Sequence, residues 1–174
     1  MDIIKQIKQG KVFIYPTDTI YGIGCIVTNR KAVKRIRNIK RRENKPFSVI
    51  VPGKAWILRN CIVNKEVREA LKKLPGPYTL ILELKRKIFP GEVNLGLKTM
   101  GVRIPRHWIS DIVKKVNRPI ITTSVNKAGK SYMTSIYDLD KGIYRKVDFM
   151  IYEGILSNKP STIINLIEKN VVKR

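Results

Sequence analysis

Residues 11–27, KVFIYPTDTIYGIGCIV, contain the pattern from which the fold can be worked out. The composition of residues 11–15 predicts a strand, and residues 25–27 predict a second strand. The intervening residues 16–24, PTDTIYGIG, combine hydroxyl groups, one carboxylate and two glycines that allow close backbone approach. Such a loop can hold a small polar ligand. It can equally be a turn in which Thr and Asp satisfy their own backbone, and both interpretations stay open at this point.

Helix-like and strand-like segments alternate along the rest of the chain. The predicted helices are residues 2–9, followed by Gly10, residues 29–40 with Asn29 as the cap, residues 65–73 and residues 107–116. The further predicted strands are residues 47–51, 78–84, 100–104, 120–123, 147–151 and 161–166. No repeat, linker or low-complexity segment interrupts them, so we expect residues 1–174 to form a single α/β domain with a mixed central sheet.

The composition is strongly basic. The chain has 174 residues, with 36 Lys and Arg against 13 Asp and Glu, which gives a net charge of +23 at pH 7. A chain of this length should bury roughly 70% of the surface that it exposes when unfolded, so it can build a core without disulfides or metal. The charge predicts anionic partners, among which nucleic acid, nucleotides and an acidic membrane face remain open.

The sequence gives no sign of a membrane or secreted protein. The longest apolar runs fall far short of the ~20 residues that a bilayer span needs. Charged residues interrupt the apolar stretch at the N-terminus, which argues against a signal peptide. We therefore expect a soluble cytoplasmic protein.

Two familiar nucleotide-binding signatures fail on inspection. Residues 22–24, GIG, begin like a dinucleotide-binding fingerprint, but the position of the third glycine is Val27. Residues 129–131, GKS, end like a P-loop, but the position of the first glycine is Ser124. We exclude both motifs.

The cysteines and the single histidine point to no metal or triad chemistry. Cys25 and Cys61 lie in apolar surroundings with no Cys or His at zinc-like spacing, so they are expected to be buried and a structural zinc site is excluded. His107 is the only histidine, at an expected helix start, where a capping or surface role is favoured over catalysis.

Residues 30–45 concentrate positive charge. Nine Lys or Arg face a single acid, Glu43, which leaves a local net charge of +8. Some of these cations form the solvated outer face of the predicted helix. Four others lie past its apolar stripe, in a connecting loop where side chains can converge on a ligand: Lys40, Arg41, Arg42 and Lys45.

Two further segments carry chemistry. Residues 99–105, TMGVRIP, place Arg103 in a buried-looking strand, where its charge needs a carboxylate or phosphate partner. With only thirteen acids in the chain, we favour a ligand over a structural salt bridge. Residues 122–129, TTSVNKAG, offer hydroxyls, an amide and backbone donors after a strand, although a capped turn would explain them too. Ligands of open α/β sheets bind beyond strand ends, so these loops are expected to share a cleft.

At this point the sequence resembles a known family. Six motifs, PTDTIYGIG, KPF at 45–47, PGPYT at 75–79, MGVRIPRH at 100–107, PIITTSVNKAG at 119–129 and PSTIINL at 160–166, occur in the order seen in the YrdC-like threonylcarbamoyl-AMP synthases. The resemblance implies a twisted open mixed sheet, flanked by helices, around a basic cavity. It also implies a nucleotidyltransferase that forms threonylcarbamoyl-adenylate and pyrophosphate from L-threonine, bicarbonate and ATP. The product would serve N6-threonylcarbamoyladenosine modification of tRNA.

The resemblance also implies site residues. For L-threonine they are Thr19, Arg103, Thr122 and Ser161. For ATP they are Lys40, Arg42, Lys45, Thr99, Ser124, Asn126 and Arg174, of which Lys40 and Arg42 would be catalytic.

The sequence departs from the family pattern in two places. The stretch 40–46 is one residue shorter than expected, so either Arg41 or Arg42 can be the functional arginine. Some relatives have a threonine-contacting histidine where this chain has Ile50.

The implied chemistry needs cations rather than a histidine base, because the attacking carbamate oxygen is already anionic. Preorganised Lys and Arg, with Mg²⁺ carried in by ATP, would stabilise the charge that develops on the phosphoryl oxygens. No protein-bound metal is expected. Asp18 can assist Mg²⁺ or order its own loop, and we favour the second role.

Two alternatives use the same charge. The chain can be a non-catalytic module that binds double-stranded RNA or tRNA, with an affinity that falls steeply with salt. It can also be a related enzyme that accepts carbamoyl phosphate. For the synthase, the expected partners are tRNA or double-stranded RNA and downstream threonylcarbamoyl-transferase proteins, without a membrane.

Overall fold

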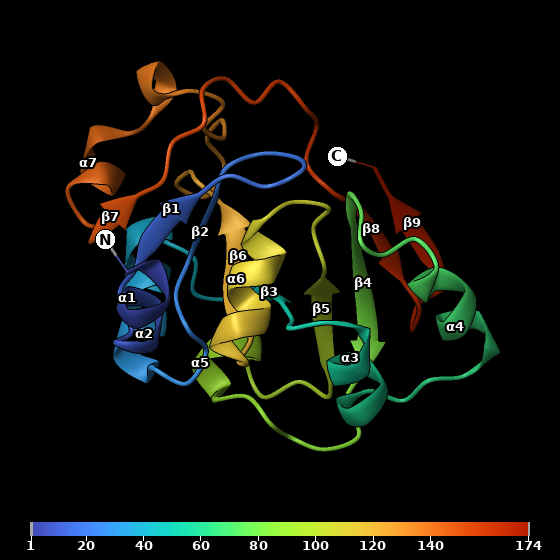
Figure 1. Ribbon diagram of the computed structural model, residues 1–174. Coiled ribbons are helices and arrows are strands. Elements are labelled where there is room, and N and C mark those ends of the chain that lie inside the picture. The colour runs from blue at the N-terminus through green and yellow to red at the C-terminus, as the bar shows by residue number, and fades with distance from the viewer. Residues whose placement is uncertain (1, 174) are drawn as a thin grey trace.

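The computed structural model describes residues 2–173 (Figure 1). The helices are α1 (Ile3–Lys8), α2 (Arg30–Lys40), α3 (Lys54–Asn60), α4 (Lys65–Leu71), α5 (Gly91–Asn94), α6 (Ile109–Val116), the 3₁₀ turn η1 (Ile136–Asp138) and α7 (Lys141–Tyr144). The strands are β1 (Phe13–Tyr15), β2 (Gly22–Gly24), β3 (Ser48–Ile50), β4 (Tyr78–Glu83), β5 (Thr99–Arg103), β6 (Ile120–Ser124), β7 (Phe149–Met150), β8 (Thr162–Asn165) and β9 (Asn170–Val172).

One mixed sheet contains the nine strands found among residues 2–173, in the order β7-β1-β2-β6-β3-β5-β4-β8-β9. Strand β6 lies near its middle and pairs antiparallel with both β2 and β3. Three pairs are parallel: β1 with β7, β3 with β5, and β4 with β8. The structure therefore confirms the predicted α/β fold with a mixed sheet flanked by helices.

The helices cover both faces of the sheet (Figure 1). Apolar residues of α1 and α6 pack with Phe13, Tyr15 and Ile50 on one face. Those of α2, α3 and α4 pack with Ile14, Val49 and other strand residues on the opposite face. Neighbouring strand residues thus point to opposite layers, as the period of two in a strand requires.

Local signals explain the bounds of α2. The Asn29 side chain accepts from the backbone N of Ala32 at 3.0 Å, so the predicted cap is confirmed. The helix ends where Arg41 adopts a left-handed conformation with φ of 50°. Its apolar residues at helical spacing, including Val33 and Ile36, are buried against the sheet.

The prediction for the second strand was wrong. The strand runs over Gly22–Gly24, and of residues 25–27 only Ile26 forms an isolated bridge, to Ile120. Glycine has a low propensity for strands, but β2 lies between β1 and β6 and packs closely against both. A Cβ on Gly24 would lie 2.0 Å from the carbonyl oxygen of Ile121 in β6. The close packing of β2 against β6 therefore requires glycine at position 24, although glycine has a low propensity for strands.

The other predicted strands and helices are present, with ends shifted by at most two residues. Short elements without a strong period were not predicted, namely α3, α5, η1, α7 and β9. Cys25 and Cys61 are buried and unbridged, as expected, and burial raises the pKa of their thiols to about 12 and about 11. Within residues 2–173, no helix has the length and apolar character to cross a membrane.

A strap of residues 151–161 connects β7, at one edge of the sheet, to β8, near the other edge. Tyr21 holds it twice: its hydroxyl donates to the carbonyl oxygen of Gly154 at 2.7 Å and accepts from Glu153 N at 2.9 Å. The ring of Tyr21 also stacks on that of Tyr152, with centroids 5.7 Å apart. The strap is thereby tied to the loop after β1.

The side chain of Glu153 anchors the same strap to the start of α6. A carboxylate oxygen lies 3.0 Å from Nε2 of His107, and Trp108 Nε1 donates to the other oxygen. His107 precedes the N-cap residue Trp108, and its Nδ1 accepts from the backbone N of Ile109 at 3.4 Å, so this histidine helps to order the start of α6.

The close approach at Gly24 gives a stability prediction. Gly24→Ala should lower the free energy of unfolding by about 1–3 kcal/mol, because the added methyl group must push two backbones apart. Gly91→Ala is the matched control, because nothing lies within 4 Å of its Cβ position. Urea unfolding followed by circular dichroism measures both, and equal effects would contradict the packing argument.

Candidate active site

The loop after β1 is ordered by its own threonines. Thr17 Oγ1 donates to the carbonyl oxygen of Ile20 at 2.7 Å and accepts from the backbone N of Thr19 at 3.1 Å. The hydroxyls of Thr17 and Thr19 are 3.0 Å apart, and each residue is 2% exposed. The turn interpretation is therefore confirmed for Thr17.

Asp18 and Arg103 form a buried ion pair. Asp18 Oδ1 accepts from Arg103 Nη2 at 3.0 Å, and Oδ2 accepts from the backbone N of Arg106 at 2.8 Å. The side chains of Asp18 and Arg103 are only 10% and 7% exposed. Arg103 Nη2 also donates to Thr19 Oγ1 at 3.1 Å.

This pair corrects two expectations. Asp18 binds the segment after β5 rather than ordering its own loop. The expected anionic partner of Arg103 is the carboxylate of Asp18, in a structural salt bridge, rather than a ligand alone, because a buried guanidinium is costly without a paired charge.

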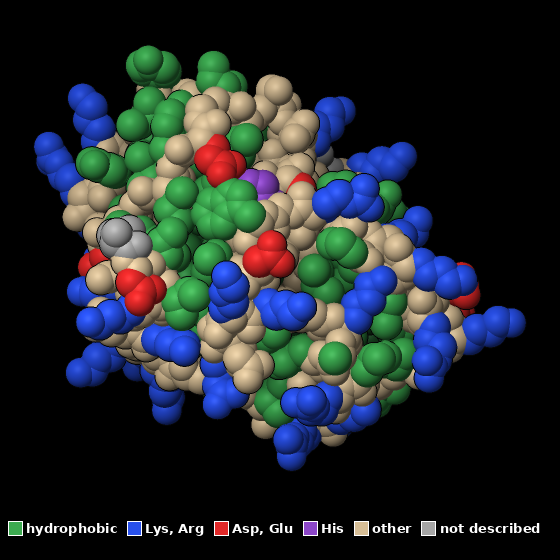
Figure 2. All heavy atoms as spheres, viewed as in Figure 1, with side chains coloured by type: hydrophobic (Ala, Val, Ile, Leu, Met, Phe, Trp, Pro, Cys, Tyr) green, Lys and Arg blue, Asp and Glu red, His purple; other side chains and the backbone are tan. Residues whose placement is uncertain are grey.

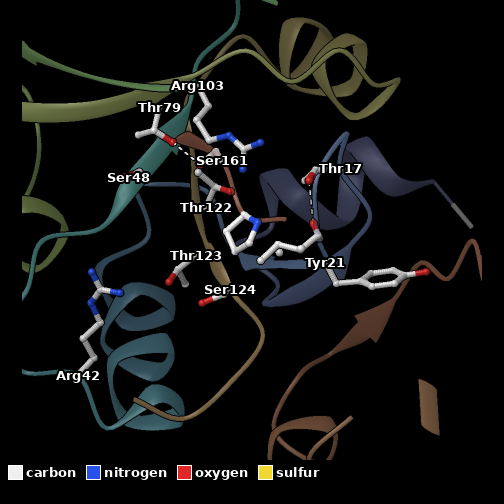
Figure 3. Close-up of a pocket in the computed structure, with 13 residues that line it drawn as sticks. Thr17, Tyr21, Arg42, Ser48, Thr79, Arg103, Thr122, Thr123, Ser124 and Ser161 are labelled. Carbon is white, nitrogen blue, oxygen red and sulfur yellow. Dashed lines mark hydrogen bonds between the residues drawn. The ribbon is translucent and has the colours of Figure 1, made fainter. Parts of the chain in front are cut away.

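Beside this pair lies a small polar hollow of about 70 Å³ (Figure 3). Most of its lining side chains carry a hydroxyl or a charge, and they come from five strands and three loops. The lining residues are Thr17, Ile20, Tyr21, Gly22, Arg42, Ser48, Thr79, Arg103, Thr122, Thr123, Ser124, Pro160 and Ser161. The hollow is too small for a nucleotide and has the character of a site for a small polar molecule.

Thr79 and Ser161 close one end of the hollow. Their hydroxyls are 2.7 Å apart, and the two residues are 3% and 2% exposed. Figure 3 shows them beside Ser48, Thr122 and Arg103, whereas Arg42 lies at the opposite end. The strap places Ser161 there, next to the first strand residue of β8.

Lys40, the last residue of α2, is 2% exposed. Its Nζ donates to the carbonyl oxygen and to Oδ1 of Asn126, both at 2.9 Å, and to the carbonyl oxygen of Ser124. Burial, together with the charge of Arg42, lowers the pKa of Lys40 to about 7. Lys40 therefore holds the loop after β6 in place through these three hydrogen bonds.

The same loop is tightened by further bonds. Ser124 Oγ donates to Oδ1 of Asn126 at 2.7 Å, and Ala128 N donates to the carbonyl oxygen of Lys40 at 2.9 Å. Ser124 and Asn126 are thus held at the end of β6 as one unit with the end of α2.

Two wider hollows adjoin the first. One, of about 470 Å³, is lined by residues of the stretch 40–45 and of the loop after β6. The other, of about 340 Å³, is lined by Lys45, Thr99, Glu168 and their neighbours. Arg42 lines all three hollows, so we treat them as one cleft with a hydroxyl-rich end and a cationic end.

The geometry distinguishes Arg42 from Arg41. Arg42 Nη2 donates to the carbonyl oxygen of Pro46 at 2.8 Å, and its guanidinium lies 5.5 Å from the ring centroid of Phe47. Arg41 lines only the second hollow. Arg42 is therefore the arginine placed to contact a ligand anywhere along the cleft.

The cleft brings together most of the predicted site residues. Arg103, Thr122 and Ser161 line the first hollow, and Thr19 lies behind its wall, bonded to Thr17 and Arg103. The remaining predictions divide between the wider hollows: Lys40, Lys45, Ser124 and Asn126 line the second, and Thr99 and Lys45 line the third. Arg174 lies outside the described residues.

Sequence reasoning missed several lining residues, among them Ser48, Thr79 and Thr123. Ser48 directly follows the KPF motif, and Thr79 ends PGPYT, so position within a motif was an available signal. Among residues 2–173, no group of three or more His, Cys, Asp or Glu is placed to hold a metal ion.

The chain is similar to known proteins. The sequence model of the Sua5/YciO/YrdC family, described as telomere recombination, matches residues 5–174. A Methanocaldococcus jannaschii protein, provisionally named threonylcarbamoyl-AMP synthase, is 40% identical over 172 residues, which cover 97% of this chain and 80% of that protein.

Two solved structures are similar throughout the chain. Pyrococcus abyssi Sua5 complexed with L-threonine has a TM-score of 0.86 and 30% identity, covering 98% of this chain and 51% of that one. This chain thus spans about half the length of that protein. Escherichia coli YciO has a TM-score of 0.84 and 26% identity, covering 98% and 84%.

The buried Lys40 gives a pH-dependent prediction. Its pKa is about 7 in the folded protein and returns to its ordinary value of 10.5 on unfolding, so unfolding takes up a proton between these values. The free energy of unfolding, relative to Lys40→Met, should therefore rise with pH in this window by up to about 1.4 kcal/mol per pH unit.

Urea unfolding of both proteins at pH 6, 7, 8 and 9 measures this difference. Groups that the two proteins share cancel in the subtraction. A difference that stays constant from pH 7 to pH 9 would contradict the lowered pKa.

Proposed function

The chain belongs to the Sua5/YciO/YrdC family, and on that premise we propose that it is a threonylcarbamoyl-AMP synthase. The substrates would be L-threonine, bicarbonate or CO₂, and ATP, and the products threonylcarbamoyl-adenylate and pyrophosphate. This is a nucleotidyl transfer, in which the adenylyl group of ATP passes to a carbamate oxygen.

One observation carries the proposal: the small hydroxyl-rich hollow beside Arg103 shares Arg42 with two wider hollows, which are lined also by Lys40 and Lys45. A small amino acid and a nucleotide would therefore meet at the boundary between the two. Arg42 lies at that boundary, since it lines every part of the cleft.

L-Threonine would occupy the hydroxyl-rich end. Arg103 is held there by Asp18 and would attract the substrate carboxylate. Thr122 and Ser161 offer hydroxyl groups that can both donate and accept, which suits an amino acid with a hydroxyl of its own. Thr19 would act by holding Arg103, to which it is bonded at 3.1 Å.

ATP would occupy the cationic end. Arg42 and Lys45 would bind its phosphates, with Ser124, Asn126 and Thr99 adding polar contacts. Lys40 donates all three of its ammonium hydrogens to the loop after β6, so we assign it the role of positioning that loop beside the nucleotide. Mg²⁺ would enter with ATP.

The reaction follows from these placements. The threonine amine and CO₂ form a carbamate with release of a proton, and a carbamate oxygen attacks the α-phosphorus of ATP. The bond from that phosphorus to the bridging oxygen breaks, and pyrophosphate leaves. Arg42 would stabilise the charge that develops, and no general base is needed because the carbamate is already an anion.

The product is a reactive mixed anhydride, which must be passed on. We propose that downstream threonylcarbamoyl-transferase proteins use it to modify a tRNA adenosine. The surface cations outside the cleft would then favour an encounter with tRNA.

The proposed reaction can be tested directly. The protein, ATP, Mg²⁺, bicarbonate and ¹⁴C-threonine should give a labelled adenylate and an equal amount of pyrophosphate. The double variant Asp18→Asn/Arg103→Gln should lose at least about 100-fold in kcat/KM for threonine, because it removes the carboxylate-binding charge without leaving a lone buried ion.

The matched control is Glu69→Gln/Lys72→Gln, which removes an exposed ion pair from α4 with the same change in net charge. Pyrophosphate release that does not depend on threonine would overturn the proposal. Such a result, combined with tight salt-sensitive binding of tRNA, would favour the non-catalytic RNA-binding alternative.

The neighbouring arginines give a second test. Arg42→Gln should lower kcat by about 100-fold, because one charge-stabilising donor is lost in the transition state. Arg41→Gln should lower kcat by less than about three-fold. Both Arg and Gln have a Cβ, so this substitution leaves the cost of the left-handed backbone at position 41 unchanged. Equal losses in the two variants, measured by pyrophosphate release, would argue against an assignment to Arg42.

A further inference from the structure

A second large groove lies outside the cleft, between α3, α6 and the segment after β5. Its volume is about 820 Å³, and it shares no lining residue with the three hollows of the cleft. The proposed synthase reaction uses none of its residues.

Cations dominate the rim of this groove. Four exposed basic side chains line it, against one acid, Asp111: Lys54, Arg59, Arg106 and Lys114. Within residues 2–173, Lys54, Arg59 and Lys114 take part in no ion pair. Figure 2 views this side of the molecule and shows Lys and Arg side chains around exposed hydrophobic surface in front of α3 and α6. The rim is therefore complementary to an anionic partner.

The floor of the groove is apolar. It includes Pro52, Pro75, Ile104 and Pro105, with Trp56 at one side. The Trp56 ring packs on Phe89, with centroids 6.0 Å apart and planes tilted by 42°. A surface of this kind, apolar in the middle and charged at the edge, is typical of a protein interface.

We propose that this groove binds an acidic segment of a partner protein, one that alternates carboxylates with large aliphatic side chains. Carboxylates would pair with the four rim cations, and aliphatic side chains would cover the proline-rich floor. A single-stranded nucleic acid fits less well, because such sites offer successive aromatic rings for stacked bases and this floor has one.

The groove lies directly behind the substrate cleft. Arg106 lines the groove and its backbone N is bonded to Asp18, which also holds Arg103 in the first hollow. A partner bound in the groove would thus be connected, through the Asp18–Arg103 ion pair, to the place where the proposed product forms. Binding itself does not depend on that reaction.

A labelled peptide tests the proposal. The probe is a fluorescein-labelled twelve-residue peptide in which Asp and Glu alternate with Leu, and fluorescence anisotropy measures its binding. Arg59→Gln/Lys114→Gln should weaken binding about five-fold, as expected for the loss of two rim ion pairs. The difference should shrink as salt is raised.

The matched control is Arg68→Gln/Lys146→Gln, which removes two exposed cations that lie outside the groove. It should change the affinity by less than about two-fold, because a long-range effect of charge alone is largely screened. Equal weakening in the two double variants would overturn the proposal, since it would show attraction to the net charge only.

A single position gives an independent test of the location. Ala55 is an exposed residue of α3 in the groove. Ala55→Glu should weaken peptide binding more than Ala55→Gln, which has the same shape without the charge. Three results would overturn the proposal: no binding of the acidic peptide, equal effects of the two substitutions, or tighter groove-dependent binding of a twelve-nucleotide oligouridylate.

Discussion

Asp18 and Arg103 form the buried ion pair that joins the loop after β1 to the end of β5, across the intervening strands β2, β6 and β3. Breaking one side of such a pair typically costs about 3–5 kcal/mol, because the remaining charge stays buried without a partner. The pair fixes the loop that carries Thr17 and Thr19 to the end of β5 and to the segment 104–106 that follows it. Asp18 therefore connects the lining of the cleft, at Arg103, to the lining of the groove, at Arg106.

The sequence predicted the parts of this architecture that depend on strong local patterns. The Asn29 cap, the apolar stripe of α2 and the apolar runs of β4 and β6 are all present. The sequence-based prediction put strand β2 at the wrong residues. Its glycines are needed because β1 and β6 approach closely on either side, and this tertiary contact is not visible in local strand propensity. Helix α3 was missed because Gly53 offers no side-chain cap and Ile57 is the single buried residue of the helix, so neither a cap nor an apolar stripe marks it.

For the candidate site too, some residues could be predicted from the sequence and others depend on the fold. Residues inside clear motifs, such as Arg103 and Ser124, could be named from the sequence. The Asp18 pairing and the Thr79–Ser161 contact join residues 85 and 82 positions apart, so only the fold reveals them. The same limit applies to Lys40, whose three hydrogen bonds reach Ser124 and Asn126, 84 and 86 positions away in the sequence.

The strap between β7 and β8 has a consequence for the order of assembly. Ser161 enters the hydroxyl-rich hollow only after the chain has crossed from one edge of the sheet to the other, and β8 then pairs with β4, formed some eighty residues earlier. Contacts of this sequence separation close late in folding, because the entropy of the intervening chain must be lost first. During synthesis the sheet centre can thus form around an open hollow, which Ser161 completes only at the end of folding.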